Sequence, residues 1–285
     1  MSDHRGHRHH VVDEHLATAA RLHLTRLDHD GFVAEVDGPG EHAVHQASSI
    51  DALLKGAYDG DLTLGELLEQ GDLGLGTVQA LDGELVVLDG VCYQVTADGV
   101  VRRPAPTMRT PFAVVCRFDP HVDEPLDGRH TLGSITERVD EIAREHAGEL
   151  GPAPILAVRI DGRFAEVDLR SVPRQDPPYP PLGDVVEHQR AWEAIADDPA
   201  GIPGTLVGFR FPPEAQGVEV AGYHLHFLSD DRTIGGHVTG ADLIAGRLRL
   251  DGTTELHLEV PAGVVVADAD TSEATAAIIR QVEGG

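Results

Sequence analysis

The sequence predicts an α+β fold with two β-rich lobes of mostly antiparallel or mixed sheet and a few flanking helices. Two observations point to this class. Short segments that alternate apolar and polar residues follow one another along much of the 285-residue chain, which is typical of strands with one buried face. Helical spacing is limited to a few segments, and the chain shows neither an internal repeat nor a G-x-G-x-x-G motif between a strand and a helix.

Composition divides the chain into three parts. Residues 1–45 carry nine of the 17 histidines, many charges and no clean periodicity, so we expect a His-rich, flexible N-terminal extension in which residues 16–27 are compatible with a short helix. Residues 46–151 are expected to form an N-terminal α+β lobe. Residues 152–285 are expected to form a C-terminal, β-rich lobe, because Gly-Pro at the boundary closes the preceding helix.

Four further segments predict helices. Residues 48–60 have an apolar stripe, and one of the two serines that open the segment is expected to cap it. A short helix follows, with Thr63 as its cap and Glu66 completing a capping box. Residues 131–150 and 185–196 carry apolar residues at helical spacing and predict two further helices.

The remaining segments predict strands. Asp89-Gly90 and Asp161-Gly162 each lie between two β-rich runs, and both are expected to be hairpin turns. Residues 111–119 predict a buried strand. Later strands are expected in GTLVGFRFP, GVEVAGYHLHFLSD, GGHVTGADLIAGRLRL and TTELHLEVP.

The formal net charge of −26 narrows the choice of partners. Such a surface repels nucleic acid and anionic lipid, so we expect neither as a partner. An acidic protein that binds an anionic substrate needs a local positive site, either a metal ion or an arginine. Cys92 and Cys116 lie in apolar runs and are expected to be buried. No apolar run approaches the ~20 residues that cross a bilayer, and no secretory signal opens the chain, so we expect a cytoplasmic protein.

Three histidines form the most informative pattern. His224 and His226 are two residues apart on an expected strand, so both side chains point to the same face. Residues 229–233 are a turn signal, after which His237 would return beside the first pair. Three histidines leave one position open on a metal, which is typical of a catalytic zinc site. An unligated pair of strand histidines is the alternative, and the return of His237 favours metal binding.

Other residues are candidates for the same site. Glu84 follows a turn and opens a strand, so its carboxylate has a route into a cleft, and Thr77 lies just before that turn. Arg170 and Arg174 stand at a Pro-rich segment, where a rigidly held guanidinium pairs well with a carboxylate. From the residues alone, each of these side chains is explained at least as well by a position on the surface.

In this order the segments resemble one known family, the α-acetolactate decarboxylases. The resemblance spans about residues 47–283 and rests on SSIDALLKGAYDGDLTLGELLEQGDLGLGT, LDGELVVLDGVCYQV, PFAVVCRF, ILAVRIDGRFAEVDLRSVPRQ and GYHLHFLSDDRTIGGHV. It implies that the chain converts 2-acetolactate to acetoin and CO2 through a metal-stabilised enediolate, in acetoin biosynthesis. It also implies a Zn2+ ion held by His224, His226 and His237 in the cleft between the lobes, and a homodimer is plausible.

The resemblance further implies roles for four residues. Thr77 matches the threonine of GLGT, Glu84 the glutamate of LDGE, and Arg174 the arginine of SVPRQ, with Arg170 as the less favoured neighbour. Glu283 matches by position a glutamate near the C-terminus. Arg174 would orient the substrate or its carboxylate, while Glu84 and Glu283 would move protons.

Two other functions stay open. A cupin-like metal oxygenase also has an HxH strand with a later histidine, and Asp230 would then supply the usual carboxylate ligand. A metal-binding protein without catalysis would use the N-terminal histidines as a buffer. Deletion of residues 1–45 separates these hypotheses, and we expect activity to survive it.

Overall fold

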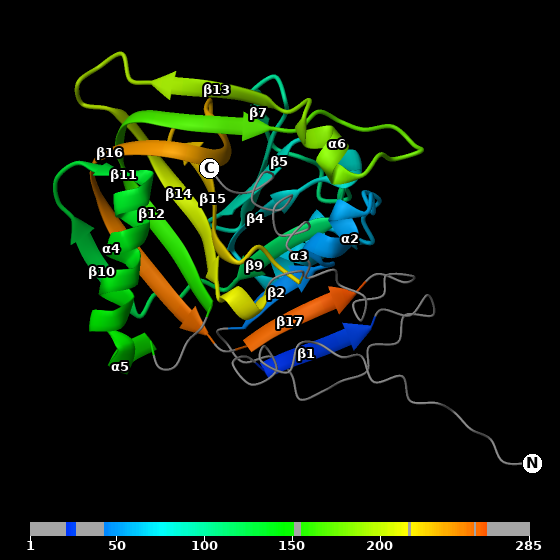
Figure 1. Cartoon of the computed structure of the whole chain (residues 1–285), viewed down its shortest axis with the longest axis horizontal. Helices are drawn as coiled ribbons and strands as arrows, with labels where there is room; N and C mark the ends of the chain where they lie inside the picture. Colours follow the sequence, from blue (N-terminus) through cyan, green and yellow to red (C-terminus); the bar gives the residue numbers. More distant parts are fainter. Residues whose placement is uncertain (1–20, 27–42, 151–154, 216–217, 254, 261–285) are drawn as a thin grey trace, which may run out of the picture.

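The computed structural model describes residues 21–26, 43–150, 155–215, 218–253 and 255–260. Within these ranges most strands belong to two large sheets that pack against each other, with short helices around them (Figure 1). The α+β fold expected from the sequence is therefore confirmed.

The first sheet contains mainly short strands from the N-terminal half of the chain. The pairings are antiparallel except where β17 lies parallel to β1 and to β2. Among the described residues its order is β1 (Arg21–Arg26), β17 (Glu255–Val260), β2 (Val44–Ala47), β9 (Phe112–Cys116), β4 (Leu73–Thr77), β5 (Glu84–Leu88), β6 (Val91–Val95) and β7 (Val101–Arg102). A separate small pair joins β3 (Leu62–Thr63) and β8 (Arg109–Thr110).

The second sheet is antiparallel and contains the long strands. In the part of the chain described here its order is β10 (Val122–Leu126), β16 (Gly235–Thr253), β15 (Gly222–Ser229), β14 (Ile202–Phe211), β12 (Ile155–Ser171) and β13 (Arg190–Ile195), and β11 (His130–Thr131) also pairs with β16. Because β12 pairs with β16 as well as with β14, strands β12, β14, β15 and β16 close into a ring. This ring places the hairpin of β15 and β16 beside β12.

The helices confirm most of the capping predictions. They are α2 (Ile50–Leu54), α3 (Leu64–Gln70), α4 (Leu132–Glu145), α5 (Ala147–Leu150) and α6 (Leu182–Val186), with single 3-10 turns η1 (Gln79–Leu81) and η2 (Pro213–Ala215). Ser49 caps α2, and Thr63 and Glu66 form the expected capping box of α3. The hairpin at Asp89-Gly90 is also confirmed, with φ of 52° and 72° at its two residues, as the hairpin turn requires.

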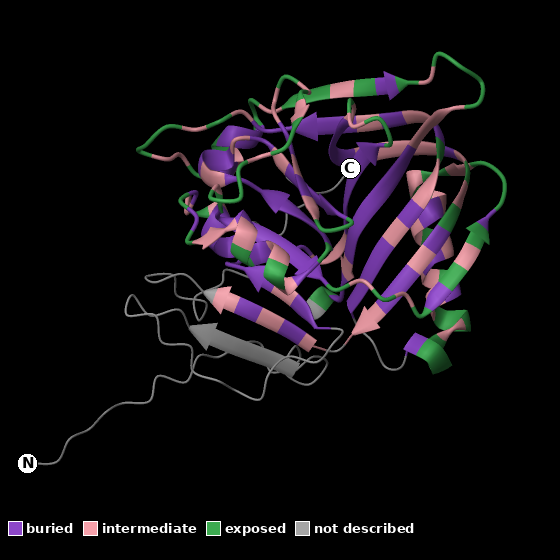
Figure 2. Ribbon diagram, turned by 180° about the vertical axis from the view of Figure 1, so that it is seen from behind, coloured by how far each residue is buried: buried purple, intermediate pink, exposed green. Residues whose placement is uncertain are grey.

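Among the described residues, three hydrophobic cores hold the layers together. The main core lies between the two sheets and combines Val86 and Phe112 of the first with Val207 and Phe209 of the second. The other cores lie under α4 and α3. Buried residues accordingly line the strands in the interior, while exposed ones gather in the outer loops and on β13 (Figure 2). Cys92 and Cys116 are both buried, as expected.

The hairpin expected at Asp161-Gly162 is wrong, because β12 runs through both residues without turning. Gly162 pairs with Gly204 on β14 and with Gly246 on β16. A Cβ atom at Gly162 would lie 2.9 Å from the carbonyl oxygen of Ala245. A glycine at this position therefore allows the neighbouring strands to approach closely, and this explains its presence without a turn.

Two expected helices are also wrong, at least in part. Of residues 185–196, only the first two belong to α6, and Arg190–Ile195 form β13, which pairs with β12. Trp192 and Ala194 alternate with exposed residues and pack on the second core, so the period is that of a strand. The described part of 16–27, Arg21–Arg26, is strand β1.

The chain crosses between the two sheets more than once. β17 comes from the C-terminal part but lies in the first sheet, whereas β10 and β11 come from the N-terminal part and lie in the second. The expected boundary at 151/152 lies outside the described residues, and the domain division stays a prediction. Since residues 44 and 45 belong to β2, deletion of residues 1–45 would also remove part of a strand between β17 and β9.

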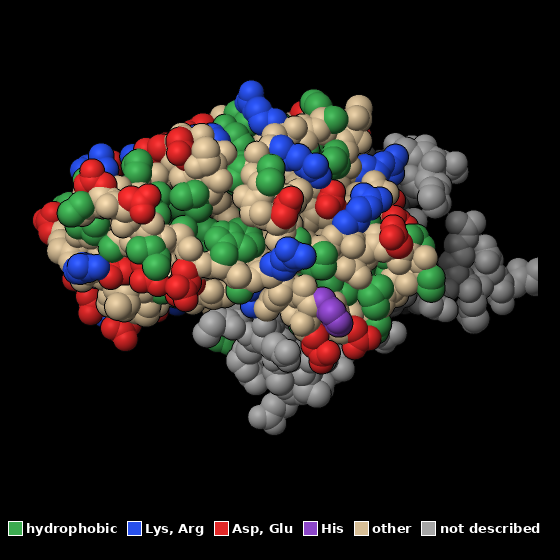
Figure 3. All heavy atoms as spheres, turned by 90° about the horizontal axis from the view of Figure 1, so that it is seen from above, with side chains coloured by type: hydrophobic (Ala, Val, Ile, Leu, Met, Phe, Trp, Pro, Cys, Tyr) green, Lys and Arg blue, Asp and Glu red, His purple; other side chains and the backbone are tan. Residues whose placement is uncertain are grey.

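The surface carries both signs of charge. On the described part of the face in Figure 3, acidic and basic side chains are interspersed with apolar ones. No helix in the described ranges is long and apolar enough to cross a membrane.

Candidate active site

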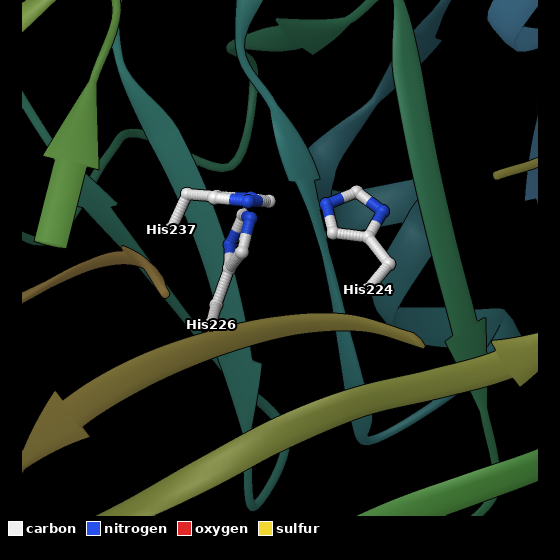
Figure 4. A group of neighbouring side chains, drawn as sticks. All are labelled: His224, His226 and His237. Atoms are coloured by element: carbon white, nitrogen blue, oxygen red, sulfur yellow. The ribbon is translucent and has the colours of Figure 1, made fainter. Parts of the chain in front are cut away.

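The structure brings His224, His226 and His237 together, as expected. His224 and His226 lie on β15, and His226 is paired with His237 on β16. One nitrogen from each ring lies within 4.8 Å of the others, and the rings converge on a common point (Figure 4). All three side chains are buried, with exposed fractions of 4%, 0% and 3%.

The turn between β15 and β16 is fixed by its own side chains. Ser229 Oγ donates to the carboxylate of Asp231, and the same carboxylate accepts a hydrogen bond from the backbone N–H of Thr233 at 3.0 Å. Ser229 Oγ also accepts from the backbone N–H of Ile234 at 2.9 Å. These local bonds close the hairpin, so the sequence between the second and third histidines determines that they meet.

His226 has a defined proton arrangement. Its Nδ1 lies 2.9 Å from the carbonyl oxygen of Leu85 on β5, and only an N–H can donate to a carbonyl. Its Nε2 therefore carries a lone pair, and this buried atom has no hydrogen-bond partner among the described residues. Burial first, then the neighbouring His224 ring and Arg170 guanidinium, lower the pKa of His226 well below 6.5. The ring is thus neutral, which is the form that binds a metal.

Glu84 and Arg170 add one charge of each sign to the group. A carboxylate oxygen of Glu84, on β5, lies 3.6 Å from Nε2 of His226. Arg170, on β12, is paired in register with His237, and its Nη2 donates to Nε2 of His237 at 2.9 Å. Arg170 is 5% exposed, so its guanidinium is held inside the protein.

A cavity that is partly open to solvent lies against this group, and the empty space within it and at its open mouth is together about 430 Å3. Its walls come from both sheets, with Thr77 and Glu84 on one side and Arg170, His224 and His237 on the other. The rest of the wall is mainly apolar: Leu53, Gly76, Leu81, Phe112, Val172, Leu182, Val186 and Gln189. An apolar pocket with a few convergent polar groups is the usual form of a small-molecule site.

The other expected site residues have different positions. Thr77 is buried and its hydroxyl donates to the carbonyl oxygen of Gly83 at 2.7 Å, which leaves the oxygen able to accept a hydrogen bond. Arg174 is exposed and is not among the residues that line the cavity. Glu283 lies outside the described residues. Asp230, the candidate ligand of the cupin hypothesis, is exposed in the hairpin turn and is not in the histidine group.

Sequence reasoning missed one acidic residue. Glu219 is fully buried, and one of its carboxylate oxygens lies 3.6 Å from Nδ1 of His224. The signal that would have found it is a single charge within the apolar run GVEVAG that leads into the HxH strand. A buried carboxylate requires compensation by a hydrogen bond or a positive group, so its position beside a histidine has a physical reason.

A buried three-histidine group at the wall of a cavity, with a carboxylate and a guanidinium beside it, is the arrangement typical of an enzyme active site, and the three histidines could hold a metal ion. Residues 44–271 match the family model described as alpha-acetolactate decarboxylase. The chain therefore belongs to the alpha-acetolactate decarboxylase family, and it is an enzyme that decarboxylates acetolactate.

Individual relatives agree with this assignment. A protein named alpha-acetolactate decarboxylase from Methylococcus capsulatus is 40% identical over 277 residues, which cover 96% of this chain and 99% of the relative. One of the same name from Klebsiella aerogenes is 37% identical over 245 residues, or 85% and 90% of the two chains. The crystal structure of alpha-acetolactate decarboxylase from Bacillus subtilis strain 168 matches with a TM-score of 0.77 and 31% identity, covering 85% of this chain and 100% of that one.

Proposed function

We propose that the chain converts 2-acetolactate to acetoin and CO2 with a zinc ion held by His224, His226 and His237. The observation that supports this most strongly is the buried histidine group at the wall of a cavity that also contains Glu84 and Arg170. A metal ion and the Arg170 guanidinium would provide the local positive charge that an acidic protein requires to bind an anionic substrate.

The residues present fit a divalent metal. Three neutral imidazoles are a donor set that zinc and its neighbours accept. His226 offers a buried Nε2 lone pair that has no hydrogen-bond partner in the described ranges, and its other nitrogen is fixed by Leu85. A divalent cation held by these residues would supply positive charge beside the substrate oxygens on which negative charge develops as CO2 leaves.

Arg170 is our candidate for binding the substrate carboxylate. Its buried guanidinium lines the cavity and donates to His237. If Nε2 of His237 binds the cation, it no longer accepts the hydrogen bond from Arg170. The guanidinium N–H groups can then donate to the substrate carboxylate, whose geometry a planar guanidinium matches well. We therefore give Arg170 the role that the sequence resemblance gave to Arg174.

Glu84 is our candidate for proton transfer. In the reaction the bond between C2 and the carboxylate breaks, and its electron pair moves to the carbon and the adjacent carbonyl oxygen. CO2 leaves, and one proton is then taken up at C2, so that acetoin forms. Glu84 lines the cavity, its side chain is 12% exposed and it lies 3.6 Å from His226, which supports a role in moving a proton to or from the substrate. Thr77 is proposed to accept a hydrogen bond from the substrate, and Glu283 is retained as the candidate for a second proton transfer.

The expected homodimer, cytoplasmic location and role in acetoin biosynthesis stay predictions. The oxygenase alternative loses support because Asp230 is exposed and because residues 44–271 match the decarboxylase family.

The decisive experiment measures acetoin from racemic acetolactate with three samples: the purified protein, a chelator-treated sample and a zinc-restored sample. We expect activity to fall to background after chelation and to return with zinc. Activity that persists in metal-free protein would refute the zinc proposal. No acetoin from folded, zinc-loaded protein would refute the proposed reaction, and oxygen uptake would then be measured.

A further inference from the structure

Glu219 is a buried carboxylate with a fixed position beside the histidine group. Its backbone N–H donates to the carbonyl oxygen of Ala215 at 2.9 Å. The preceding carbonyl, of Val218, accepts hydrogen bonds from the Gln46 side chain at 2.7 Å and from the Ile50 backbone at 3.0 Å. The short segment that leads into β15 is thus held by β2 and α2, and Glu219 is 0% exposed.

The carboxylate of Glu219 and the histidine group face opposite sides of the His224 ring. Oε1 of Glu219 lies 3.6 Å from Nδ1 of His224. Figure 4 shows the other nitrogen of this ring, Nε2, pointing toward His226 and His237, while Nδ1 points away from them. The group of potential ligands contains the three histidines without Glu219. Glu219 is therefore placed to act on a ligand rather than on a metal directly.

A carboxylate 3.6 Å from Nδ1 favours the tautomer of His224 that has its proton on Nδ1. An Nδ1–H directed at a carboxylate leaves the lone pair on Nε2, and the negative charge makes that lone pair more basic. His226 has this tautomer through a closer, neutral acceptor, because its Nδ1–H donates to the carbonyl oxygen of Leu85 at 2.9 Å. The two histidines of β15 thus have an oxygen atom on their outer sides: the Leu85 carbonyl oxygen, which accepts a hydrogen bond from His226, and the Glu219 carboxylate, 3.6 Å from Nδ1 of His224.

We propose that Glu219 is a positioning residue for the metal site: it holds His224 with the proton on Nδ1, so that Nε2 is the ligand atom, and it thereby strengthens metal binding. This inference rests on the proposed function, in which the three histidines hold a divalent cation. Glu219 has no contact with substrate in this scheme, so its first effect is on the affinity for the metal.

The test compares the full-length protein with Glu219→Gln and Glu219→Asp. Zinc affinity is measured by competition with a chromophoric chelator, and the ligand field is followed by the visible absorption of the Co2+-substituted proteins. We expect Glu219→Gln, which keeps the shape but not the charge, to bind zinc about 10–100-fold more weakly and to shift the Co2+ bands. Glu219→Asp keeps the charge and is expected to lose less.

Asp251→Asn is the matched control. Asp251 is another buried carboxylate that pairs with a histidine, with 3.0 Å between its oxygen and Nδ1 of His121, and it does not line the cavity. Its variant is expected to keep the zinc affinity of the wild type. Wild-type protein that binds no zinc would refute the proposed function. Two results with a wild type that binds zinc would refute the role of Glu219 but not the proposed function. One is a zinc affinity of Glu219→Gln within about twofold of the wild type, and the other is a weaker zinc affinity for Glu219→Asp than for Glu219→Gln.

Discussion

Substitution of Arg170 and Arg174 distinguishes the two arginines that the sequence placed near the site. Arg170 is 5% exposed and donates to His237 at 2.9 Å, while Arg174 is exposed. The variants are Arg170→Lys, which keeps the charge but not the planar fork, Arg170→Met, which removes both, and Arg174→Met as the matched control.

The size of the effect follows from the burial of the guanidinium. A hydrogen bond to a charged group contributes about 1.5–3 kcal/mol, and each ~1.4 kcal/mol is a factor of about ten in rate or binding. We therefore expect Arg170→Met to lose about 10–150-fold in kcat/KM, Arg170→Lys to lose less, and Arg174→Met to stay within about twofold of the wild type. The substrate carboxylate is present before the reaction and leaves as neutral CO2. Most of the loss should therefore be in KM rather than kcat.

The assay is initial-rate acetoin formation across a range of acetolactate concentrations, with zinc content and thermal unfolding measured for each variant. Zinc content separates loss of substrate binding from loss of the metal, because Arg170 also contacts His237. A large loss in Arg174→Met with little change in Arg170→Met would refute our choice of Arg170. A loss in kcat with KM unchanged would show that Arg170 acts on the chemical step and does not bind the ground-state carboxylate.

Two further predictions concern stability and the N-terminal histidines. Burial, then the neighbouring His257 and Arg117, lower the pKa of His45 from 6.5 to about 4. Between pH 6.5 and pH 4, His45 is therefore protonated in the unfolded chain but neutral in the folded protein. Its contribution to the free energy of unfolding is complete above pH 6.5 and is lost as the pH falls toward 4. Urea titrations from pH 7 to 4 measure the free energy of unfolding of the wild type and of His45→Gln. We expect the variant to lose less of this free energy on acidification, by at most about 3 kcal/mol. The same pH dependence of the free energy of unfolding in both proteins would contradict the prediction. Deletion of residues 2–20 removes five histidines. We expect kcat/KM and the zinc content to stay within about twofold of the wild type, because the described cavity residues begin at Leu53. Loss of the catalytic zinc would instead favour a metal-buffering role for the N-terminal histidines.

The histidine group was predictable from sequence because its geometry is local. Two histidines at strand spacing, a turn of Ser, Asp and Thr, and a third histidine after the turn are all contained in one hairpin. The capping box at Thr63 and the hairpin at Asp89-Gly90 were predictable for the same reason. In each case the residues that make the bonds are a few positions apart.

The features that were missed depend on distant partners. Gly162 follows an aspartate as in a hairpin turn, but Gly204 and Gly246 lie opposite it and β12 continues. Arg170 and Arg174 look equivalent in sequence. The structure separates them because β12 ends at Ser171, so only Arg170 is still in the strand and opposite His237. Glu219 lies beside His224 because the segment before β15 is held against β2 and α2, which are distant in the sequence.

The same contacts hold the two sheets together and determine the arrangement of the site. His226 donates from β15 to Leu85 on β5, and Ser171 donates from β12 to Val95 on β6 at 2.9 Å. Each bond joins the second sheet to the first, and each involves a residue in or next to the site. Glu84 directly precedes Leu85, so the bond that orients His226 also fixes the distance between the histidine group and Glu84. A change that separates the sheets would therefore disturb the carboxylate and the histidines together, because no loop lies between them to absorb the movement.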